Sequence, residues 1–141
     1  MTIEMHRGTN PTISVAMEAG ITLVPTKDVV VNSESVTRKS CVTIRRSMDK
    51  IDAITADDEL QIEIEKTDVE EGVGTHSDSN GNVFTVQPDR ASLYLSQEFT
   101  KMLTEPVYFL QFNLIKENGD MFVVEPMPIM IHVLANIAYI Q

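Results

Sequence analysis

The residues of this chain that could do chemistry are few and lie far apart. The three histidines are His6, His76 and His132. A zinc site uses several His or Cys ligands at short intervals, so these separations predict structural histidines and no metal site. The single cysteine, Cys41, rules out an internal disulfide framework. Because Cys41 stands in a strand-like run of Val, Thr and Ile, we expect a small buried or half-buried side chain rather than a nucleophile.

The acidic residues suggest two further kinds of site. The run Asp78-Ser79-Asn80-Gly81-Asn82 resembles the first half of a calcium-binding loop, with Asp89 at the twelfth position. Its glycine falls at the fourth position instead of the sixth, and no glutamate closes the loop, so the run predicts a turn. Glu63 and Glu65 share a strand face that should point to water, which does not suit a general acid and base.

Sequence motifs of catalysis are missing. The chain contains no Gly-x-Ser-x-Gly elbow, phosphate-binding glycine loop or His-Glu-x-x-His motif, so we expect neither an enzyme nor a cofactor. The formal net charge of −10 argues against nucleic acid and against an anionic membrane surface as partners. No apolar run approaches the ~20 residues of a membrane-spanning helix, and the N-terminus lacks the pattern of a secretory signal. We therefore expect a soluble chain.

The elements that would position surface groups are mainly β-strands. The 141 residues correspond to one domain, and 43% of them are hydrophobic, with Val, Ile and Thr frequent. Alternation of apolar and polar residues, typical of half-buried strands, is clearest in Ile13-Val15-Met17 and Leu60-Ile62-Ile64. Val29-Val30-Val31 predicts either a short strand or a buried connector. Further strands are expected at 36–45, 83–87, 91–95, 107–115, 121–124 and 129–134.

Local signals define how some of these strands are connected. Asn118-Gly119 stands between two strand-like runs, and both residue types tolerate positive φ, so the pair predicts a type I′ hairpin. The run 107–115 is apolar on both faces, which predicts a central strand that is fully buried.

A short helical turn is expected between the strands of the second half. Ser96 can accept hydrogen bonds from the free N–H groups of a turn over 97–103, whose Phe99, Met102 and Leu103 would plug an open end. The fold class predicted from all these elements is all-β. We expect an immunoglobulin-like β-sandwich of about seven to nine short strands with one short capping helical turn.

Four segments fall outside this regular pattern. Residues 1–10 are expected to form an N-terminal arm, and 46–59 could be a helical turn or a loop. Residues 67–82 are polar and contain three glycines, which predicts a long exposed loop. Residues 135–141 form an apolar C-terminal tail. With these segments included, residues 1–141 are expected to form a single domain.

The arm and the tail are the expected sites of contact with other chains. The residues that we expect to bind a partner are His6 and Arg7 in the arm and Ile137, Tyr139 and Ile140 in the tail. An uncharged apolar terminus is usually buried, either in its own subunit or in a neighbour, and both possibilities are open for this tail.

Two segments of the sequence resemble a known kind of protein. His6-Arg7-Gly8-Thr9-Asn10-Pro11-Thr12 is similar to the opening of small phage and prophage structural proteins, which begin near His-Arg-Gly-Asp-Thr-Pro-Thr. The second halves of those proteins contain Leu-Thr/Ser-Gln-Glu-x-Thr, a strand with Gln and a turn with Gly. The matching residues here are Leu95–Thr100, Gln111 and Asn118-Gly119-Asp120. Thr9 and Asn10 depart from the pattern, and residues 46–82 are not covered.

The resemblance implies a non-enzymatic structural subunit of a tailed-bacteriophage virion, with an immunoglobulin-like fold. Its place would be the capsid surface, head fibre, neck or baseplate. It implies a symmetric multi-copy assembly with other virion proteins, made in the bacterial host cytoplasm and localised in the virion. It carries over no catalytic residue. The alternative is a carbohydrate- or protein-binding module that recognises a bacterial cell surface, which exposed aromatic side chains clustered on one face would favour.

Overall fold

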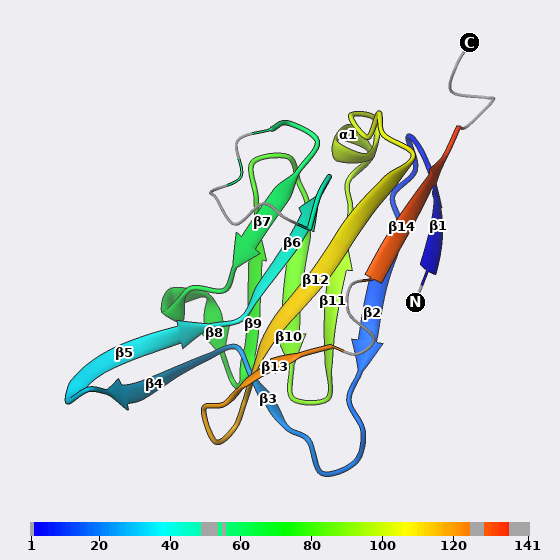
Figure 1. Ribbon diagram of the computed structural model, residues 1–141. Helices are drawn as coiled ribbons and strands as arrows, with labels where there is room; N and C mark the ends of the chain where they lie inside the picture. Colours follow the sequence, from blue (N-terminus) through cyan, green and yellow to red (C-terminus); the bar gives the residue numbers. More distant parts are fainter. Residues whose placement is uncertain (1, 49–53, 55, 125–128, 136–141) are drawn as a thin grey trace.

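The chain folds into two packed β-sheets, from which a hairpin projects (Figure 1). The computed structural model describes residues 2–48, 54, 56–124 and 129–135. The first sheet has the order β1 (Thr2–His6), β14 (Ile129–Leu134), β12 (Val107–Lys116), β6 (Cys41–Arg45) and β7 (Leu60–Glu63); β13 (Met121–Val123) and β3 (Leu23–Val24) also pair with β12. The second sheet has the order β2 (Thr12–Ala16), β11 (Arg90–Tyr94), β10 (Val83–Gln87), β9 (Val73–Ser77) and β8 (Val69–Glu70). The projecting hairpin consists of β4 (Thr26–Val31) and β5 (Glu34–Lys39).

The order of the strands confirms the predicted immunoglobulin-like sandwich. Neighbours β6, β12 and β14 correspond to strands C, F and G of that fold, and β2, β11 and β10 correspond to B, E and D. Tyr108, near the start of β12, occupies the position of the tyrosine corner. Its hydroxyl accepts a hydrogen bond from the backbone N–H of Glu105 at 3.1 Å and donates to Asp58 Oδ2 at 2.6 Å.

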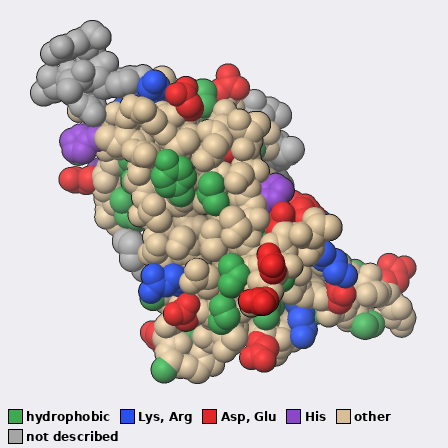
Figure 2. Space-filling model, turned by 180° about the vertical axis from the view of Figure 1, so that it is seen from behind, with side chains coloured by type: hydrophobic (Ala, Val, Ile, Leu, Met, Phe, Trp, Pro, Cys, Tyr) green, Lys and Arg blue, Asp and Glu red, His purple; other side chains and the backbone are tan. Residues whose placement is uncertain are grey.

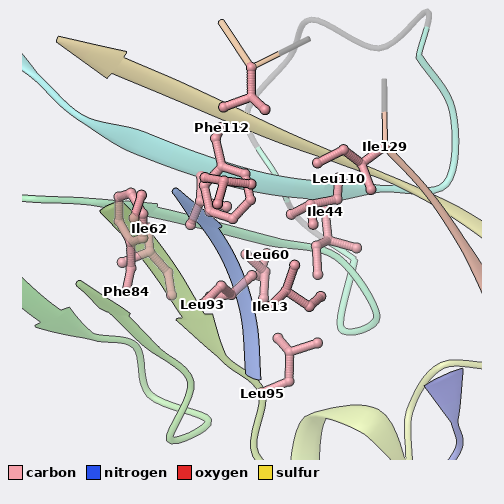
Figure 3. Close-up of a cluster of buried hydrophobic side chains, with 14 of the residues drawn as sticks. Ile13, Ile44, Leu60, Ile62, Phe84, Leu93, Leu95, Leu110, Phe112 and Ile129 are labelled. Carbon is pink, nitrogen blue, oxygen red and sulfur yellow. The ribbon is translucent and has the colours of Figure 1, made fainter. Parts of the chain in front are cut away.

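The core lies between the inner faces of the two sheets, where apolar side chains from both interdigitate (Figure 3). Phe84 of the second sheet and Phe112 of the first have ring centroids 6.1 Å apart. The predicted alternation of the first strand is confirmed, because Ile13 and Val15 are buried while their neighbours on β2 are exposed. Leu60, Ile62 and Ile64 are likewise buried, as their spacing predicted.

The predicted helical turn is also confirmed. Helix α1 (Gln97–Thr100) begins after Ser96, whose hydroxyl accepts a hydrogen bond from the N–H of Phe99 at 3.1 Å. Phe99 and Leu103 are buried, so the turn does close one end of the sandwich.

Two segments predicted to lack regular structure are strands instead, so both predictions are wrong. The expected N-terminal arm, 1–10, contributes β1, which pairs in parallel with β14 and buries Met5. The expected exposed loop, 67–82, contains β8 and β9, preceded by the 3₁₀ turn η1 (Lys66–Asp68). Glu71 and Gly72 both have positive φ between the paired residues Glu70 and Val73, which is the geometry of a two-residue hairpin turn.

The Asn118-Gly119 hairpin forms, but with a different turn. Gly119 has a φ of 95°, whereas Asn118 is not among the residues with positive φ, so the turn is not type I′. The N–H of Gly119 donates to the carbonyl of Lys116, and the N–H of Lys116 donates to that of Asp120. This three-residue connection is the kind in which a turn ends on a left-handed glycine.

Three further expectations change in detail. Strand β12 is central, but its burial alternates, with one face buried and the other mostly half-buried, because no element in the described part of the chain fully covers the outside of the first sheet. The run 36–45 divides at Ser40 into β5 and β6. Val29-Val30-Val31 belongs to β4, where Val30 is 75% exposed, so it is not a buried connector.

The helical turn considered for 46–59 falls mainly on 49–53, outside the described residues.

The hydrogen bond between Tyr108 and Asp58 leads to a test of the fold. Tyr108→Phe should lower the free energy of unfolding by about 1–3 kcal/mol, because the Asp58 carboxylate, only 4% exposed, loses its phenolic donor. Burial, and then the bond to Asp58, raise the pKa of Tyr108 above its usual 10.0. The neutral phenol therefore stabilises the fold fully below about pH 10 and loses this effect as pH rises through the folded-state pKa.

Urea unfolding at neutral and alkaline pH measures both effects. The difference between wild type and Tyr108→Phe should shrink above about pH 10, where the phenol ionises. Tyr94→Phe is the matched control, since the Tyr94 hydroxyl bonds only to the exposed Asn10 amide in the described contacts. Equal losses in the two variants would contradict the role assigned to Tyr108.

Candidate interaction surfaces

The structure does not gather the residues considered for metal binding. Among the described residues, no three or more His, Cys, Asp or Glu side chains are placed to hold a metal ion. His76 lies on β9, not in a loop, with Nδ1 2.8 Å from Asp68 Oδ2, so it ties that strand to η1. His6 is exposed at the end of β1, and His132 is half-buried on β14.

Asp78 orders a turn, as the spacing of the glycine predicted. Its carboxylate accepts hydrogen bonds from the backbone N–H groups of Asn80 and Asn82 and from the Asn82 side chain, all between 2.9 and 3.0 Å. Gly81 follows with a φ of 85°. Asp89 lies beyond the other end of β10, so the structure does not bring the two carboxylates of the calcium-like run together.

The other candidate side chains are committed to internal contacts or held unreactive. Cys41 is half-buried, as predicted, and burial raises the pKa of its thiol to about 12. Glu63 is exposed, while Glu65 is half-buried and pairs with Lys39 at 2.6 Å. Both glutamates, together with His76, line an open groove of about 530 Å³ beside β7.

The residues predicted to contact partners have different positions. Arg7 is half-buried, and its Nε donates to the carbonyl of Leu103 at 2.7 Å, so this side chain anchors β1 to the end of the α1 segment. His6 remains exposed. Ile137, Tyr139 and Ile140 lie outside the described residues. Their proposed contacts therefore stay a prediction.

The projecting hairpin, Thr26–Lys39, is the surface that reasoning from the sequence missed. It extends away from both sheets (Figure 1) and exposes Val30 by 75%, Val31 by 40% and Val36 by 43%. Val29 pairs directly with Val36, so Val31 and Val36 lie on one face of the hairpin and Val30 on the other. Both faces of the tip are therefore partly apolar.

A turn without glycine makes this hairpin hard to recognise. Asn32 and Ser33 have φ values of 51° and 66° between the paired residues Val31 and Glu34, as a type I′ turn requires. The usual signal for such a turn is Asn-Gly, and serine at the second position weakens it. Asn32, which stands between two runs containing β-branched residues, was the one available clue to this turn.

The hairpin is anchored at a buried cluster that we call the hairpin root: Pro25, Ser40, Ile64 and Gly74. The N–H of Ser40 donates to the carbonyl of Pro25, and the N–H of Ile64 donates to that of Ser40, both at 2.9 Å. A Cβ placed on Gly74 would lie 2.6 Å from Ile64 Cγ2 and 2.6 Å from Pro25 Cβ. The root thus joins the start and end of the hairpin to strands of both sheets.

Polar contacts hold the half of the hairpin nearest the body. Lys39 Nζ contacts Glu65 at 2.6 Å, Lys66 Nζ contacts Asp28 at 2.9 Å, and Arg38 donates to the carbonyl of Gly119 at 2.6 Å. A hydrogen bond from Thr37, and then one from Lys66, lower the pKa of Asp28, so its carboxylate stays charged at neutral pH. These contacts fix the direction in which the valine tip points.

No helix in the described part of the chain is long and apolar enough to span a membrane. Comparisons of the chain with models of protein families, with curated proteins and with solved structures give no significant match. A proposal about function therefore rests on the geometry of the surfaces and on the resemblance of the two sequence segments.

The contact at the hairpin root can be tested by substitution. Gly74→Ala should lower the free energy of unfolding by about 1–3 kcal/mol, because its methyl group would overlap Ile64 and Pro25, which are part of the packed root. Urea unfolding followed by circular dichroism measures the loss. Thr75→Ala, at the next, exposed position of β9, is the control and should change stability by less than about 0.5 kcal/mol.

The state of Cys41 can be tested by thiol chemistry. With a pKa of about 12, only about one thiol in 10⁴ is ionised at pH 8 in the folded chain. An unfolded thiol has a pKa of about 8.5, so a disulfide reagent should react with the native protein on the order of a thousandfold more slowly than with the urea-unfolded protein. Similar rates in the two states would show that Cys41 is accessible and readily ionised.

Proposed function

We propose that this chain is a non-enzymatic structural subunit of a tailed-bacteriophage particle, present in several symmetric copies and docked at the capsid surface, head fibre, neck or baseplate. The observation that carries the proposal is the projecting hairpin with valines exposed on both faces. The resemblance of the two quoted sequence segments to phage structural proteins supports the same conclusion.

The hairpin supports docking for an energetic reason. A two-stranded ribbon is marginally stable in water on its own, and this one keeps three valines largely out of contact with the core. Covering an exposed valine side chain completely stabilises a complex by about 1.5–3 kcal/mol. Since both faces of the tip carry valine, a partner that encloses the tip gains more than one on which the ribbon lies flat.

The sandwich body suits the role of a rigid spacer. Its two sheets enclose one core, α1 closes one end, and the hairpin root fixes the hairpin at the opposite end (Figure 1). His76 and the buried Asp58 are placed in structural contacts, and among the described residues no group of three or more His, Cys, Asp or Glu side chains could hold a metal ion. The features that differ from a plain immunoglobulin-like domain therefore lie at its surface.

The proposal is tested on purified particles. Mass spectrometry should find the protein in virions at a fixed copy number relative to the major capsid protein. The variant Val30→Thr/Val31→Thr/Val36→Thr keeps side-chain shape and β-propensity but removes three exposed methyl groups. Its incorporation should fall about tenfold or more in competition with wild type, because each lost apolar contact weakens docking by about 1 kcal/mol.

The matched control is Met121→Thr, which changes an apolar side chain that is 49% exposed on β13, away from the hairpin tip. It should be incorporated like wild type. Particles without the protein would refute the particle role, and normal incorporation of the triple variant would refute docking through the tip. Glycan-array binding by the isolated protein would favour a cell-surface recognition module instead.

A further inference from the structure

The outer face of the second sheet forms a regular array of side chains. Strand pairing aligns two rows of four outward-pointing residues across β2, β11, β10 and β9, and a third row of three across β2, β11 and β10. We call this array the hydroxyl face; its rows are Thr12–Tyr94–Val83–Ser77, Ser14–Ser92–Thr85–Thr75 and Ala16–Arg90–Gln87. The complementary positions of β2, β11 and β10 point into the core; they are Ile13, Val15, Ala91, Leu93, Phe84 and Val86.

The hydroxyl face is almost without charge on a strongly charged protein. Arg90, in the third row at the start of β11, is its single charged residue, although 23% of the chain is Asp, Glu, Lys or Arg and the net charge is −10. Figure 2 shows this side of the molecule: the upper middle is uncharged, and the charged side chains lie around the edges and toward the lower end.

The central row consists entirely of hydroxyl side chains. Ser14 and Ser92 are hydrogen-bonded to each other at 2.9 Å, and Thr75 donates to Thr85 at 3.4 Å. A hydroxyl group has one donor and two acceptor sites, so each of these residues can make further hydrogen bonds. A row of hydroxyl groups is complementary to an identical row, which a row of carboxylates or of ammonium groups could not be.

We propose that the hydroxyl face binds the hydroxyl face of a second copy of this chain, in a contact with two-fold symmetry. Such a contact places the same surface of both subunits against each other and is closed after two copies. The two flat sheets would pack face to face, as sheets do in sandwiches.

Electrostatic repulsion between two copies of this chain is weaker at this face than elsewhere on the surface. Two copies, each with a net charge of −10, repel one another wherever acidic edges meet. Four strands spaced at about 4.8 Å make the face roughly 19 Å wide, so its centre lies roughly 10 Å from the edges. A contact through this face therefore places mainly uncharged side chains opposite one another and leaves the charged edges at its rim, where salt with a Debye length of about 8 Å screens exposed charges.

The size of the face predicts a weak pair. Its plan area is roughly 320 Å², from four strands and five residues along each, whereas a standard interface buries about 800 Å² per partner. Dimers of the isolated chain should therefore form only at high concentration. Copies fixed near one another on a particle would pair far more readily, and to that extent the inference rests on the proposed function.

The experiment is sedimentation of the full chain from about 10 μM to about 1 mM. Wild type should show a reversible monomer–dimer equilibrium. Ser92→Glu and Ser92→Lys each place like charges in the centre of a two-fold contact, so each variant alone should dimerise at least about tenfold more weakly. An equimolar mixture of the two variants should recover dimers, because the charges across the contact are then opposite.

Gln61→Glu and Gln61→Lys are the matched controls, since Gln61 is exposed on the outer face of β7 in the other sheet. They should dimerise like wild type. A monomeric wild type at the highest concentration, unchanged dimerisation of the Ser92 variants, or a mixture that stays monomeric would each overturn the inference. Absence of the protein from purified particles would refute only the proposed function, because sedimentation does not depend on it.

Discussion

The packing of Pro25 and Ile64 against Gly74 is the contact that connects the parts of this molecule. Gly74 belongs to β9 of the second sheet, while Ile64 follows β7 of the first. Pro25 and Ser40 stand where the chain enters and leaves the projecting hairpin. A single glycine without a side chain thus lets the two sheets and the hairpin meet at one point, and the polar contacts of Lys39, Lys66 and Arg38 then fix the direction of the hairpin.

The charge of the chain determines which surfaces can make contacts. The projecting hairpin, residues 26–39, contains three basic and two acidic residues, so it carries a net charge of +1. The rest of the chain holds the remaining eight basic and nineteen acidic residues, a net charge of −11. Repulsion between bodies therefore opposes random association, and the hairpin and the hydroxyl face are the surfaces least affected by it.

Much of the fold could be predicted from the sequence because the strands are half-buried. Alternation in runs such as Leu60-Ile62-Ile64 reports directly which side chains face the core. The Ser96 cap is equally local, since the hydrogen bond to the N–H of Phe99 spans three residues. Such features depend on neighbours within one turn or one strand, and sequence patterns contain that information.

The features that were missed depend on distant partners or on unusual turns. Residues 2–6 appeared irregular because their partner, β14, lies at the other end of the chain. The turns at Asn32-Ser33 and Glu71-Gly72 adopt positive φ without the Asn-Gly pair that usually marks it. The hydroxyl face had no signal in the sequence at all, because strand register alone aligns serines and threonines from four separate segments.

The two proposed surfaces would have different symmetry, and that difference bears on how a multi-copy assembly could be built. A contact between two hydroxyl faces is closed by its two-fold axis, so it produces pairs and cannot propagate. The hairpin projects sideways beyond this face, at the lower right of Figure 2, so it stays available in such a pair. Each pair would then present two valine tips to other proteins, and binding by one tip raises the effective concentration of the second. Weak contacts at both surfaces would in this way combine into stable attachment, without any large interface on the single subunit.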